Sequence, residues 1–68
     1  MSTAPRWIGI DGRPIACVEK IKVLNENYDE LDRLAQDAFD DALLVGCDEV
    51  WLREEMHRLI DGLQASFS

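Results

Sequence analysis

The chain has 68 residues, of which 47% are hydrophobic, and 14 Asp and Glu against seven Lys and Arg give a formal net charge of −7. This length limits the chain to one domain, which argues against a multi-domain enzyme. The acidic excess argues against binding to nucleic-acid phosphates. A disordered acidic tail would contain fewer Leu, Ile, Val and aromatic residues. We therefore expect a small, folded, acidic protein.

The charge is unevenly distributed along the chain. Residues 1–24 contain four basic and two acidic side chains, a balance of +2, whereas residues 25–68 contain three basic and twelve acidic side chains, a balance of −9. Such an asymmetry can guide a positively charged partner, or a second copy of the chain, towards the acidic part.

Two features bear on location. The longest apolar run, residues 42–45, is far shorter than the roughly 20 residues that span a bilayer, and the N-terminus lacks the pattern of a secretory signal. We therefore expect a cytoplasmic protein with no membrane contact. Two cysteines are too few for a disulfide framework, so we predict that Cys17 and Cys47 are free, partly buried thiols.

Residues 1–16 are predicted to form a flexible or extended arm with a turn at Asp11-Gly12, since Asp-Gly is typical of tight turns. Pro14 suits the first turn of a following helix. A short hairpin over residues 7–18 remains an alternative, although two short strands alone would be marginally stable.

A long helix is predicted from about residue 17 to 45, because apolar residues recur there at steps of three and four. Acidic side chains fall on the opposite side, which makes this helix amphipathic. A break near residues 25–27 remains an alternative, because Asn27 with Glu30 three residues later could cap a new helix.

A second helix is predicted from about residue 48 to 63. Gly46 is typical of the end of the preceding helix, and Asp48 is a favourable N-cap for the new one. Two ion pairs at a spacing of four residues are expected on its exposed side: Glu49–Arg53 and Glu54–Arg58.

The short link between these helices predicts an all-α, antiparallel two-helix hairpin over residues 17–68. Two helices rarely enclose a sufficient core, so we expect two hairpins to pair into a dimeric four-helix bundle. The predicted interface contains Leu24, Tyr28, Leu31, Ala35, Ala38, Ala42, Leu52, Met56, Leu59 and Leu63.

Two tryptophans are candidate partner anchors, because aromatic residues at the edge of an apolar surface often anchor an interface. Trp7 lies in the arm and Trp51 lies beside the apolar stripe of the second helix. The alternative is that Trp7 folds back on Trp51 or Tyr28 and covers the hairpin.

Glu54 and His57 have the Glu-x-x-His spacing of di-iron bundles. Counting about 100° per residue places both on the polar side of the helix, so a metal site is only a distant alternative. Cys47 with His57 supplies too few ligands for a closed zinc site. With no nucleophile set or phosphate loop in the sequence, we expect no enzymatic activity and no cofactor.

The Ala42-x-x-x-Gly46 spacing followed by Leu52 resembles part of a DNA-binding helix-turn-helix, but Glu55 stands where that pattern needs an apolar residue. The would-be recognition helix is also acidic, so we expect no nucleic-acid binding. The sequence thus predicts a small non-enzymatic interaction or accessory protein that forms a homodimer. The alternative is an acidic inhibitor or nucleic-acid mimic that binds a basic protein surface.

Overall fold

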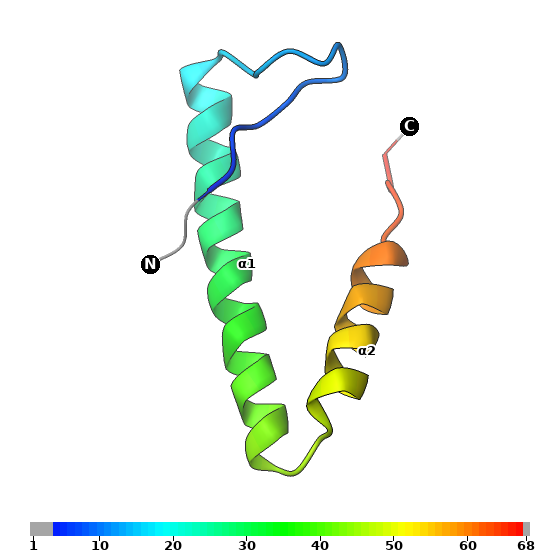
Figure 1. Cartoon of the computed structure of the whole chain (residues 1–68). Coiled ribbons are helices and arrows are strands. Elements are labelled where there is room, and N and C mark those ends of the chain that lie inside the picture. Colours follow the sequence, from blue (N-terminus) through cyan, green and yellow to red (C-terminus); the bar gives the residue numbers. More distant parts are fainter. Residues whose placement is uncertain (1–3, 68) are drawn as a thin grey trace. The chain divides into compact units, whose positions relative to one another are not determined.

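The computed structural model describes residues 4–67, and these contain two α-helices and no strand. Helix α1 spans Val18–Leu44 and helix α2 spans Glu49–Asp61 (Figure 1). The predicted all-α class and both predicted helices are confirmed, and each observed end lies within two residues of the predicted one.

Helix α1 continues without interruption through residues 25–27, so the alternative of a break at this point is not realised. The side chain of Asn25 is engaged by a hydrogen bond from Trp7, and Asn27 is exposed to solvent. Neither asparagine therefore turns its side chain into a cap for a new helix start.

The chain divides into two compact units, the first ending at Gln36 and the second beginning at Asp37, so that α1 contributes residues to both. Each unit is described separately below. The division predicted from the sequence, an arm over residues 1–16 and a helical domain over residues 17–68, stays a prediction.

In the first unit, the segment before α1 forms a closed loop. Ile8 and Pro14 make an isolated antiparallel bridge, and the backbone N–H of Ile15 donates to the carbonyl oxygen of Trp7 at 2.9 Å. The segment therefore has the pairing of a hairpin but no strand among the described residues. We call residues 4–16 the arm.

The tip of the arm is a tight turn. The N–H of Gly12 donates to the carbonyl oxygen of Gly9 at 2.9 Å, and Gly12 has a φ of 81°. This left-handed conformation is accessible to glycine because it has no Cβ. The Asp11 carboxylate accepts from the N–H of Arg13 at 3.0 Å and holds the far side of the turn.

In the second unit, α1 ends in a Schellman motif centred on Gly46, whose φ is 103°. The N–H of Gly46 donates to Leu43 and the N–H of Cys47 donates to Ala42, at 3.1 and 2.9 Å. These bonds occupy carbonyl groups that the helix end would otherwise leave open. The sequence prediction that Gly46 ends the helix is confirmed.

Helix α2 begins at the predicted cap, because the Asp48 side chain accepts from the backbone N–H of Trp51 at 2.9 Å. The predicted ion pair between Glu49 and Arg53 is present at 3.1 Å. The predicted Glu54–Arg58 pair is wrong.

Arg58 instead meets Glu55, at 3.4 Å and a spacing of three residues. Spacings of three and four residues both bring side chains together on a helix surface, so a sequence with adjacent glutamates does not decide between them.

None of residues 4–67 is buried, and fourteen large hydrophobic side chains among them are exposed. The predicted partial burial of the two thiols is wrong, since Cys17 and Cys47 are both free and exposed. Cys17 lies just before α1 and Cys47 lies in the link before α2, where little surrounds a side chain. The described residues of neither unit therefore enclose a core of the kind a stable small domain normally has.

Candidate functional site

The arm is attached to α1 through Trp7. The indole Nε1 donates to the side-chain oxygen of Asn25 at 2.7 Å, and the indole lies edge-on to the ring of Tyr28, with ring centroids 5.8 Å apart and planes at 77°. An edge-to-face pair of this kind places the positive ring edge against the negative ring face. The sequence left two roles open for Trp7, as an anchor for a partner or as a side chain that folds back on Trp51 or Tyr28. Within the chain, Trp7 contacts Tyr28.

A pocket of about 410 Å³ lies beside this attachment. Residues of the arm and two side chains of α1 form its walls, which mix apolar and polar groups. The lining residues are Ala4, Pro5, Arg6, Trp7, Pro14, Ile15, Ala16, Ile21 and Asn25. Since no two titratable side chains face each other across it, this pocket offers no acid–base or nucleophilic pair.

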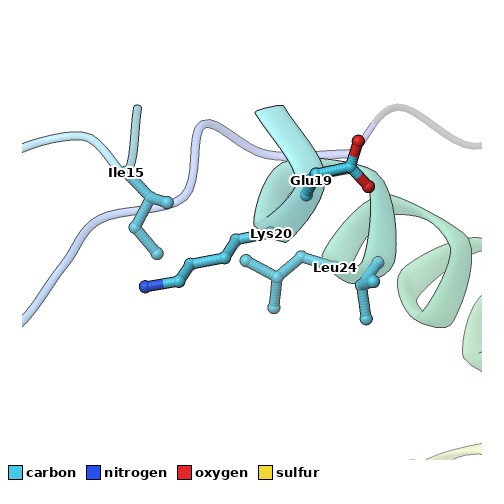
Figure 2. Close-up of a pocket in the computed structure, with 5 residues that line it drawn as sticks. Ile15, Glu19, Lys20 and Leu24 are labelled. Carbon is cyan, nitrogen blue, oxygen red and sulfur yellow. The ribbon is translucent and has the colours of Figure 1, made fainter. Parts of the chain in front are cut away.

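A second hollow is an open groove of about 450 Å³ with an almost entirely apolar lining, made by Ile15, Glu19, Lys20, Val23 and Leu24. Figure 2 shows the aliphatic stem of Lys20 extending towards Ile15, while the Glu19 carboxylate points away. Long charged side chains often cover apolar surface with their stems in this way. The groove can therefore accept an apolar side chain and offers one positive charge at its edge.

The predicted interface residues differ in exposure. Exposed members are Leu31, Ala38, Leu59 and Leu63. Partly buried members are Leu24, Tyr28, Ala35, Ala42, Leu52 and Met56. The contact with Trp7 covers Tyr28 on one side, so this residue is less available to a partner than the sequence pattern suggests.

The predicted interface leaves out two residues of the exposed apolar surface on α1, Val23 and Leu34, although the spacing already places Leu34 beside the apolar seam. Val23 is 55% and Leu34 is 58% exposed, close to the 56% of Leu31. Both fall within about 80° of Leu31 when 100° per residue is counted, so the sequence places them on the same side of the helix as the predicted interface.

The other candidate anchor, Trp51, is 56% exposed on α2. On the same unit, the guanidinium of Arg53 lies over the ring of Phe39, 4.7 Å from its centroid, while its Nη2 also meets the Glu49 carboxylate. The cation thus connects the last turns of α1 with α2 in the second unit.

Glu54 and His57 are both exposed. Among residues 4–67 there is no group of three His, Cys, Asp or Glu side chains placed to hold a metal ion. No helix of this described part has the length and apolarity needed to cross a membrane.

Residues 4–67 therefore offer an exposed apolar surface with acidic surroundings and an apolar groove. Comparisons with protein-family models, with curated proteins and with solved structures each gave no match.

Proposed function

We propose that this chain is a small, acidic, non-enzymatic interaction protein that acts as a homodimer, two antiparallel helical hairpins forming a four-helix bundle. One observation carries the proposal: fourteen large hydrophobic side chains of residues 4–67 are exposed and none is buried. Monomeric proteins rarely leave large contiguous apolar surfaces in water. Association covers such surface and supplies the burial that a chain of this length lacks.

The charge pattern supports the same arrangement. Acidic side chains gather on one side of α1, which keeps that side in solvent and leaves the apolar side for contact. Three small residues at spacings of three and four, Ala35, Ala38 and Ala42, would let a neighbouring helix approach closely.

A test follows from mass action. If folding requires association, the midpoint of thermal unfolding rises with protein concentration, because dimer formation stabilises the folded state in proportion to the logarithm of concentration. Unfolding is followed by circular dichroism from low to high micromolar chain concentration. A midpoint that stays constant over this range contradicts the proposal.

The second candidate is an acidic inhibitor or nucleic-acid mimic that binds a basic protein surface, and the −9 balance of residues 25–68 favours it. The two candidates differ in salt dependence. Capture of a basic partner through acidic side chains weakens steeply from low to moderate ionic strength, whereas association through apolar surface hardly changes.

The immobilised chain is incubated in one experiment with a cell extract and in another with a tagged copy of itself. The bound proteins of each experiment are eluted with increasing salt. Retention of the tagged copy at moderate salt supports the homodimer. Release of basic proteins at low salt, with no retention of the tagged copy, supports the mimic instead.

A further inference from the structure

In the first unit, the arm leaves one side of α1 uncovered. Asn25 and Tyr28, which contact Trp7, lie within about 60° of each other around the helix. Another set of α1 residues is centred roughly 120° away from them and contains three apolar side chains that are more than half exposed, Val23, Leu31 and Leu34. We call this set the open stripe; it consists of Val23, Leu24, Asn27, Leu31 and Leu34.

The two ends of the open stripe differ. At its N-terminal end lies the apolar groove of about 450 Å³, whose lining includes Lys20, Val23 and Leu24. Figure 2 shows Lys20 and Leu24 at this groove. At its C-terminal end two leucines, Leu31 and Leu34, stand 56% and 58% exposed. One end is therefore hollow, and the other presents two exposed leucines.

Asn27 lies midway between these ends, seven residues after Lys20 and seven before Leu34. If two copies of α1 pair antiparallel about a two-fold axis beside Asn27, Leu31 and Leu34 of each copy lie over the groove of the other. The dimer then contains this contact twice. Such self-complementarity is the requirement for a closed symmetric dimer.

The charges of the first unit favour the same antiparallel direction. Up to residue 24 the balance is +2, whereas residues 25–36 contain Arg33 against four acidic side chains, a balance of −3. Antiparallel pairing brings the basic half of one copy against the acidic half of the other. Parallel pairing would bring like charges together, which costs free energy and disfavours that alternative.

We propose that the first units of two chains pair antiparallel along the open stripe, with Leu31 and Leu34 of each copy entering the groove of the other. This inference rests on the proposed homodimer and specifies its contact face and direction. The apolar side chains supply the affinity, and the charges select the direction. Asn27 meets its symmetry mate at the axis, where a polar residue fixes the register of paired helices.

Disulfide trapping tests the direction and the face together. In full-length chains that carry Cys17→Ser and Cys47→Ser, Lys20→Cys is introduced into one chain and Leu34→Cys into a second chain of distinguishable mass. The two are mixed and oxidised, and the products are identified by non-reducing mass spectrometry. The antiparallel pairing predicts the mixed disulfide as the major product, because residues 20 and 34 lie opposite each other.

A matched control uses Arg33→Cys in place of Leu34→Cys. Arg33 is next to Leu34 in the sequence but points about 100° away from it around the helix. The mixed disulfide with Lys20→Cys is therefore expected to be lost. If the two mixed chains instead give disulfides within each kind, the pairing is parallel and the inference is wrong.

A dimer by light scattering that forms no disulfide at all shows that another face is used, and this overturns the inference while leaving the homodimer intact. A monomer by light scattering overturns the proposed function itself. The two failures are therefore distinguishable.

Discussion

The indole of Trp7 lies edge-on to the ring of Tyr28 at a centroid distance of 5.8 Å, and so ties a segment outside the helices to the side of α1. The same indole donates a hydrogen bond of 2.7 Å to Asn25. A single side chain thus makes both of these interactions between the arm and the N-terminal half of α1, and its removal should release the arm.

Trp7→Ala should lower the free energy of unfolding by about 1 to 3 kcal/mol, because it removes an aromatic pair and a partly buried hydrogen bond. Trp7→Phe keeps an aromatic ring and loses only the donor, so it should cost less. Urea unfolding followed by circular dichroism, at one fixed protein concentration, measures both. Equal stability of Trp7→Ala and the parent chain would show that the arm contact contributes nothing.

Gly46→Ala should destabilise the chain by roughly 1 to 2 kcal/mol, since a Cβ is unfavourable at a φ of 103° even though the surrounding space is open. Gly46→Asn is the matched control, because asparagine tolerates this conformation better. Thermal unfolding compares the two variants. A loss as large for asparagine as for alanine would point to a cause other than backbone conformation.

Asp48→Ala should cost about 0.5 to 2 kcal/mol, because the N–H of Trp51 loses the oxygen that caps the start of α2. Asp48→Asn retains a capping oxygen and removes the charge, so it separates the hydrogen bond from the interaction with the helix dipole. Helical content and unfolding midpoint are read by circular dichroism. If alanine and asparagine behave alike, the cap hydrogen bond is not what stabilises this helix end.

Ala38→Glu should abolish or strongly weaken self-association, because it places a charge on the exposed small-residue side of α1 that the proposed dimer covers. Gln36→Glu adds the same charge two residues earlier, about 200° around the helix, and should leave the dimer intact. Size-exclusion chromatography with light scattering reports the mass of each. If the Ala38→Glu variant is still a dimer, this side of α1 does not belong to the interface.

Local signals in the sequence predicted the helices well. Steps of three and four between apolar residues gave α1, and both Gly46 and Asp48 act at the helix ends as their residue types indicate. These features depend on neighbours within one helical turn, so a single sequence contains nearly all the information that decides them.

The arm and the exposed surface were harder to predict, because they depend on contacts between residues far apart in sequence. The Trp7–Asn25 hydrogen bond spans 18 residues, and nothing in the arm sequence selects Asn25 over other acceptors. Trp7 covers part of Tyr28, whereas Val23 and Leu34 stay more than half exposed. The spacing of apolar residues identifies the apolar face of a helix. It does not show which part of this face is covered by another segment of the same chain.

The most direct test of the central claim, that the exposed apolar surface is covered by a second copy, is the molar mass of the chain in solution. Light scattering on the eluting peak at micromolar concentration should give twice the 7.7 kDa of the single chain, in low and in moderate salt alike. A mass of 7.7 kDa under the same conditions would contradict the account.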